Sequence, residues 1–247
     1  MFLPHPNDLD SPVVYFKVGP NEKEFSVHVN VLKDRLASFC STLDLPNCVI
    51  GFHDDIEDIF GYVLQFLYCG DYHISLLADE SGHIAHEDGT TITSDRLLPL
   101  RGNYFQTCAT TQRFLDHPVE SFAQTPILPI SGEAKTICQS FDALLIHARL
   151  HIFAKNHGIG TLHHLSLWKL VHALEHLELD SCRTEGVVKL LLLVSDLMEK
   201  GDTLYTVMAH YAASRSRLLV RCPHFASLML KRPELNYSIL SNICASL

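Results

Sequence analysis

Short runs of bulky, mostly β-branched and aromatic residues near the start of the chain predict strands. Val13–Val18 stops at Gly19-Pro20-Asn21, a combination typical of a turn. A second strand is expected over Glu24–His28 and a third over Cys48–Phe52. Tyr72–Ile74 has the composition of a short fourth strand.

Between these strands the apolar positions recur with the spacing of a helix. The first helix is expected to begin with Asn30 as its N-cap. Its apolar residues lie on one face: Val31, Leu32, Leu36 and Phe39. The second helix is expected to begin at Asp54 or Asp55, where Asp54 and Glu57 have the spacing of a capping box, and to end at Gly70. Its apolar residues form a stripe that we expect to face a core: Ile56, Ile59, Phe60, Val63, Leu64 and Leu67.

From Ser75 to Ser140 no hydrophobic period persists for the length of a helix. Polar clusters such as Asp79-Glu80-Ser81-Gly82 favour a solvated segment. We therefore expect residues 75–140 to be an insertion that loops out from the surface and is partly disordered. Deleting most of it should leave the melting transition nearly unchanged, because loop-closure entropy varies slowly with loop length.

Beyond this stretch the helical spacing returns and continues to the end of the chain. Four helices are predicted from the apolar periods and the residues that flank them: Asp142 to Gly158, Thr161 to Leu177, Thr184 to Lys200 and Asp202 to Pro223. Two shorter helices are expected around Pro233. The predicted fold class is therefore α+β, with short strands first and an all-helical C-terminal region.

Composition narrows the classes of function. The 247 residues are 47% hydrophobic and 19% charged, as in ordinary globular proteins. A formal charge of −9 has the wrong sign for a phosphate backbone, so nucleic acid is not an expected partner. The longest apolar stretch, Val187–Met198, is interrupted by polar residues and is shorter than the roughly 20 residues that a membrane span needs. The first ten residues lack the pattern of a secretory signal, so we expect a cytoplasmic or nuclear protein with no membrane association.

Eight scattered cysteines, with no C-x-x-C pair, fit free thiols in a reducing compartment.

Five segments along the chain form a recognisable series: Val18-Gly19-Pro20, Phe25-Ser-Val-His28 with Val31-Leu32, Phe66-Leu67-Tyr68-Cys69-Gly70-Asp71-Tyr72, His147–Ile159 with Leu162 and Leu165, and Leu204–Ala213 with the residues up to Leu240. In this order they resemble the BTB/POZ family in its fungal form. The resemblance implies a BTB/POZ-like core of short strands flanked by helices. It also implies three regions: a flexible tail at 1–10, a BTB/POZ-like domain at 11–180 that contains the insertion, and a C-terminal helical extension at 181–247. The motif positions, which we expect to be mostly structural, are Phe25, Val27, His28, Leu32, Phe39, Leu67, Tyr68, Gly70 and Tyr72.

A family of this kind implies a non-enzymatic protein-interaction module that associates with itself or recruits partners. One job that the resemblance implies is that of a substrate adaptor for a cullin-type ubiquitin ligase. The candidate dimer surface is Val13, Val14, Tyr15 and Leu36. Pro12 and Leu36 stand where the family usually has Asp and Ser, and Pro12 lacks a backbone donor. We therefore expect a homodimer formed by helix packing rather than by strand exchange. The substitution Leu36→Glu should dissociate this homodimer, because it would bury an unpaired charge at the interface.

Sixteen histidines raise an alternative, a small metal- or ligand-binding helical protein or an enzyme built from the C-terminal helices. His147/His151 and His172/His176 have the i, i+4 spacing of zinc ligands, but neither pair has the H-E-x-x-H glutamate. Gly158-Ile-Gly160 lacks the third glycine of a dinucleotide loop and follows a helix. We expect no catalytic residue, metal or cofactor, and metal analysis of the purified protein would separate the two hypotheses.

Overall fold

A computed structural model describes residues 9–36, 49–52, 56–74 and 141–245. Three strands form one sheet: β1 (Val13–Val18), β2 (Lys23–His28) and β3 (Val49–Phe52), in the order β2-β1-β3. Strand β1 pairs antiparallel with β2 and parallel with β3. These are the first three predicted strands, each confirmed to within one residue at its start, although Cys48 lies outside the described residues.

The fourth predicted strand, Tyr72–Ile74, is wrong. Tyr72 lies outside the sheet with its side chain fully buried. Its backbone N–H donates to Asp71 Oδ1 at 2.7 Å and its carbonyl accepts from Lys169 Nζ at 2.5 Å. Side chains therefore satisfy the backbone groups that a neighbouring strand would otherwise bond. Aromatic residues are enriched in strands because their side chains pack well there, but the Tyr72 side chain packs into the core from a segment that is not a strand.

Helix α2 (Val29–Arg35) begins two residues earlier than a cap at Asn30 requires, so that prediction is wrong. His28 is the N-cap residue and makes no side-chain capping bond. The segment before β1 supplies the partners instead: the Val29 N–H donates to the Pro12 carbonyl at 2.8 Å and the Asn30 N–H donates to Ser11 Oγ at 3.1 Å. Two of the otherwise unpaired donors of the helix start are satisfied from outside the helix.

Helix α4 (Glu57–Cys69) confirms the predicted stripe. Five of its six positions are buried, namely Ile56 just before the helix, Ile59, Phe60, Val63 and Leu67, while Leu64 is partly buried against the same core. Phe66 is also buried, at 1% exposed. The helix ends at Gly70 in the left-handed conformation (φ 72°), whose N–H bonds the Phe66 carbonyl, as expected for a glycine C-cap. The predicted start with a capping box of Asp54 and Glu57 is wrong, because Ile56 is the N-cap residue and Glu57 is the first residue of the helix; Asp54 and Asp55 themselves lie outside the described residues.

Helices α8 (Phe141–Asn156) and α9 (Gly160–Glu175) form a hairpin that turns at Gly158 (φ 68°). Thr161 was predicted to cap the second helix but lies inside its first turn, and Ile159 is the N-cap residue. The Ile159 N–H bonds the Ala154 carbonyl at 2.8 Å across the turn. A turn closed by backbone hydrogen bonds needs no capping side chain, which explains why the helix does not begin at the threonine as predicted.

The remaining helices are α10 (Ser181–Leu197), α11 (Thr203–Ser214), α12 (Ser216–Leu219), α13 (Pro223–Lys231) and α14 (Pro233–Ala245). Asp180, not Thr184, caps α10, so this helix begins and ends about three residues before its predicted bounds. Asp202 caps α11 as predicted, with Oδ1 2.8 Å from the Leu204 nitrogen. The single predicted helix from Asp202 to Pro223 is wrong, because the chain breaks at Arg215 into α11 and α12.

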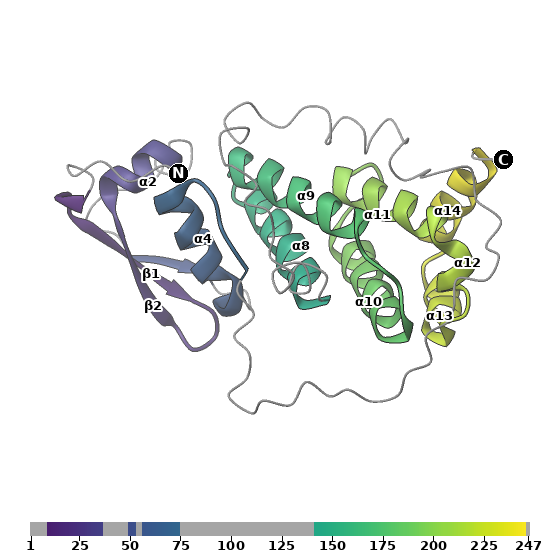
Figure 1. Cartoon of the computed structure of the whole chain (residues 1–247). Helices are drawn as coiled ribbons and strands as arrows, with labels where there is room; N and C mark the ends of the chain where they lie inside the picture. The colour runs from purple at the N-terminus through teal and green to yellow at the C-terminus, as the bar shows by residue number, and fades with distance from the viewer. Residues whose placement is uncertain (1–8, 37–48, 53–55, 75–140, 246–247) are drawn as a thin grey trace, which may run out of the picture.

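Two hydrophobic cores share the α8–α9 hairpin, which lies between the sheet with α2 and α4 on one side and α10–α14 on the other (Figure 1). From α8, Leu150 and Phe153 pack into the first core, whereas Leu144 and Ala148 pack into the second. The hairpin therefore belongs to both parts of the molecule. The inner face of the sheet contributes alternate residues to the first core: Val14, Phe16, Val18, Val27, Ile50 and Phe52.

Candidate interaction surface

Two of the motif segments, the one that ends at His28 and the one that contains Tyr68, meet at the start of α2. His28 Nδ1 lies 2.7 Å from the Tyr68 hydroxyl, which also accepts the His28 backbone N–H at 3.2 Å. The two rings stand edge to face with centroids 5.9 Å apart. Val27 and Leu32 beside them are fully buried. His28 is half-buried and links the end of β2 and the start of α2 to α4 through these contacts.

Other motif positions lie in the same core. Phe25 is partly buried and its ring tilts onto Phe60, with centroids 4.9 Å apart. Leu67 is 2% exposed, and Gly70 ends α4. Phe39 lies outside the described residues. The motif positions that the structure describes therefore contribute to packing and to the end of α4.

A second polar contact joins α8 to the segment after α4. The Tyr72 hydroxyl lies 2.7 Å from His147 Nδ1, with both side chains buried. Lys169 forms an ion pair with Asp71, and its Nζ stands 4.3 Å from the centroid of the Tyr72 ring. Burial raises the pKa of Tyr72, with Asp71 adding to the effect. Burial, and then the charge of Lys169, lower the pKa of His147 to about 3, so the imidazole is neutral at neutral pH.

His151, one turn further along α8, has different partners from His147. Its Nδ1 donates to the His163 carbonyl at 3.0 Å, and the two imidazole rings stack with centroids 3.9 Å apart. In the neutral ring Nε2 then carries a lone pair, and this atom is buried without a hydrogen-bond partner, 4.0 Å from Asp202 Oδ1. Burial, and then His163, lower the pKa of His151 to about 4.

Asp202 has other partners. Its Oδ2 lies 2.5 Å from Lys155 Nζ, while Oδ1 caps α11. Burial opposes ionisation of this carboxyl, but the bonds from Lys155 and from the Leu204 N–H outweigh it and lower its pKa. The carboxylate therefore links α8 to the start of α11, and both of its oxygens are used in these structural contacts.

The second histidine pair lies on α9. His176 Nδ1 bonds the His172 carbonyl at 2.9 Å, the rings are 5.8 Å apart between centroids, and His172 stacks on Trp168 at 4.7 Å. Burial lowers the pKa of His172. Within residues 9–36, 49–52, 56–74 and 141–245, no group of three or more His, Cys, Asp or Glu side chains is arranged to hold a metal ion.

The residues proposed for a dimer surface divide between the two faces of the sheet. Val14 is 0% exposed and Leu36 is 7% exposed, and both pack into the first core. Tyr15 points outward and is 50% exposed, and Val13 beside it is half-buried. Leu36→Glu would therefore destabilise the fold itself, so it cannot serve as a probe of an interface.

Strand β3 adds a residue that the sequence did not single out. Val49 is the register partner of Tyr15 and is 60% exposed. We call Val13, Tyr15 and Val49 the outer sheet face. Two large apolar side chains side by side on solvent-facing strands are a candidate contact surface for another protein.

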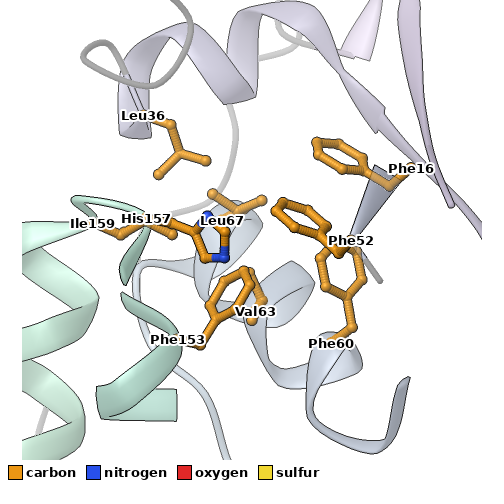
Figure 2. Close-up of a pocket in the computed structure, with 9 residues that line it drawn as sticks. All are labelled: Phe16, Leu36, Phe52, Phe60, Val63, Leu67, Phe153, His157 and Ile159. Carbon is orange, nitrogen blue, oxygen red and sulfur yellow. The ribbon is translucent and has the colours of Figure 1, made fainter. Parts of the chain in front are cut away.

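One hollow opens between the sheet, α4 and the α8–α9 turn (Figure 2). Its walls are almost wholly apolar: Phe16, Leu36, Phe52, Phe60, Val63, Leu67, Phe153, His157 and Ile159. It has room for about one water molecule. The aromatic walls pack on one another, with the Phe52 and Phe153 rings edge to face at 5.5 Å. A hollow this small and apolar is a packing defect of the core and not a ligand site.

Comparison with known proteins adds no relative: no family model, no curated protein and no solved structure matches the chain. Among the helices of the described residues, none combines the length and apolar character needed to cross a membrane.

Proposed function

We propose that this chain is a protein-interaction module with a BTB/POZ-like core, which acts by binding other proteins and not by catalysis. One observation carries the proposal: the three central motif segments, far apart in the sequence, are joined by two hydrogen bonds, His28 to Tyr68 and Tyr72 to His147. Both contacts lie between segments that carry the resemblance. The order of hairpin, helix, strand and helix, followed by further helices, is the order predicted from the sequence pattern apart from its fourth strand, and it is compatible with a BTB/POZ-like core.

Self-association through the outer sheet face is the simplest form of this function. Tyr15 and Val49 offer neighbouring apolar area that the helices of the described residues leave exposed. Strand exchange is disfavoured, because the segment before β1 is held by its own α2 through Ser11 and the Pro12 carbonyl. The expected dimer is therefore one in which each copy keeps its own strands.

Sedimentation velocity at about 50 µM tests this form of the proposal. We expect wild type to sediment as a dimer and Tyr15→Glu as a monomer, because an unpaired charge buried at an interface costs several kcal/mol, about a hundredfold or more in the dissociation constant. Leu192→Glu is the matched control, since Leu192 is 40% exposed on α10 and should leave the dimer intact. A monomeric wild type, or a dimeric Tyr15→Glu, would refute self-association through this face.

A cullin-type scaffold is the second partner that the resemblance implies, which would make the chain a substrate adaptor of a ubiquitin ligase. Isothermal titration of the purified full chain against the N-terminal region of a cullin tests that role directly. Saturable binding at one copy per chain supports it. Absence of measurable heat at about 50 µM protein, with the chain folded by circular dichroism, argues against it.

A further inference from the structure

The last helix, α14, has apolar residues on two opposite faces. Leu235 and Ile239 are buried on the side that packs against α11. On the opposite side Tyr237 is 67% exposed, Leu240 is 53% exposed and Cys244 is exposed as a free thiol. Glu234 is the helix's only charged residue. A surface helix usually carries charged residues on its outer face, whereas the outer face of α14 carries mainly apolar and uncharged polar residues.

Exposed apolar side chains gather at this end of the molecule. Nine large hydrophobic residues are exposed within the described part of the chain, and four of them lie between residues 220 and 240. Leu230 on α13 is 85% exposed and Val220, just after α12, is 65% exposed. Helices α13 and α14 pack against each other at the far end from the sheet (Figure 1). We call Leu230, Tyr237 and Leu240 the C-terminal apolar face.

The last helices are rich in basic residues. Residues 203–247 hold five basic residues and one acidic residue, whereas residues 1–202 hold 14 basic and 27 acidic residues. One of the five, Arg232, forms an ion pair with Asp196 of α10. Arg217, Arg221 and Lys231 are exposed and form no ion pair with any described residue. Lys200 Nζ lies 5.1 Å from the centroid of the Tyr237 ring, so a cation also borders the apolar face.

We propose that the C-terminal apolar face binds an acidic peptide segment of a partner protein, one that carries apolar side chains among its carboxylates. Exposed aromatic and aliphatic anchors are the composition of a protein-binding patch. Two cations accompany them, Lys231 next to Leu230 in the sequence and Lys200 over the Tyr237 ring, and they favour a negative partner and oppose the same face of a second copy. This surface lies at the opposite end from the outer sheet face, so the proposal does not depend on self-association.

Fluorescence anisotropy with the full chain and two synthetic helical peptides tests the proposal. Both peptides, of about 18 residues, carry leucines at i, i+3, i+4 and i+7, and their other positions are mostly Glu in one and mostly Lys in the other. We expect the Glu peptide to bind about tenfold or more tightly than the Lys peptide in about 50 mM salt, and to weaken markedly in about 500 mM salt. Equal affinity for the two peptides would overturn the proposal.

Substitutions then test whether the Glu peptide binds at the C-terminal apolar face. Tyr237→Ser and Lys231→Glu should each weaken the Glu peptide about tenfold or more, with unchanged circular dichroism, because both side chains are exposed. Tyr15→Ser is the matched control, an exposed tyrosine at the other end, and should bind as wild type. Full binding by Tyr237→Ser refutes the site. Binding to vesicles with about 30% phosphatidylserine but not to the Glu peptide refutes the partner class and indicates an anionic membrane.

Discussion

The two buried histidines of α8 should make the protein sensitive to mild acid. His147 and His151 have pKa values of about 3 and about 4 in the folded chain, against 6.5 for an ordinary histidine. Both are neutral when folded, and both bind a proton in the unfolded chain once the pH falls below about 6.5. The folded state is therefore fully favoured above pH 6.5 and loses stability as the pH falls towards 4.

The size of the loss follows from proton linkage. Between pH 7 and pH 5 each histidine removes about 2 kcal/mol of folding free energy, so the pair removes about 4 kcal/mol. This value hardly depends on the folded pKa as long as it stays near 4 or below. A typical domain has only about 5–15 kcal/mol in total, so the effect is large enough to measure.

Urea unfolding at a series of pH values, followed by the fluorescence of the single Trp168, measures this dependence. His147→Gln and His151→Gln each keep a polar group of similar size without a titrating ring. In the double variant the loss between pH 7 and pH 5 should be smaller than in wild type by about 4 kcal/mol. His164→Gln, at an exposed position of α9, is the control and should follow the wild-type curve. If the double variant loses as much stability as wild type, the two imidazoles are not held neutral by the fold.

Other expected outcomes concern packing, and urea unfolding at pH 7 measures each. Gly186→Ala should destabilise the fold by about 1–3 kcal/mol, because an added Cβ would stand 2.7 Å from the Phe141 ring. Gly61→Ala, in the middle of α4 with nothing within 4 Å of the added Cβ, should instead stabilise by about 0.5–1 kcal/mol, and equal effects at the two glycines would contradict the packing described. Tyr72→Phe should cost about 1–3 kcal/mol by leaving His147 Nδ1 buried without its partner, and a neutral result would mean that water replaces the hydroxyl.

Much of the fold was predictable because its patterns are local. The inward stripe of α4, its glycine C-cap at Gly70 and the aspartate cap of α11 at Asp202 each depend on residues within a few positions of one another. The misplaced helix starts have a common cause. Asn30, Thr161 and Thr184 are typical capping residues, but each lies inside a first turn whose start is set by partners outside the helix or by a neighbouring residue.

For the candidate surface, the outward-facing residues of β1 were predictable from the sequence, but their neighbour on β3 was not. Alternation along β1 separates Val14 from Tyr15, and Lys17 on the same side as Tyr15 marks the face that meets water. That signal was available and would have removed Val14 from the dimer surface. The contribution of Val49 could not be predicted from the sequence, because its position beside Tyr15 depends on the parallel register of two strands more than thirty residues apart. Contacts such as Tyr72 with His147 depend on tertiary structure in the same way.

The shared hairpin also fixes when the protein can fold during synthesis. The first core needs Leu150, Phe153, Ile159, Leu162 and Leu165 from α8 and α9 to cover the residues contributed before Tyr72. Roughly 90 residues separate Tyr72 from Leu165. At typical rates of synthesis the ribosome needs about 5–20 s to add them. For that time the sheet and the apolar stripe of α4 stay uncovered, and this is when the nascent chain most needs a chaperone to prevent aggregation.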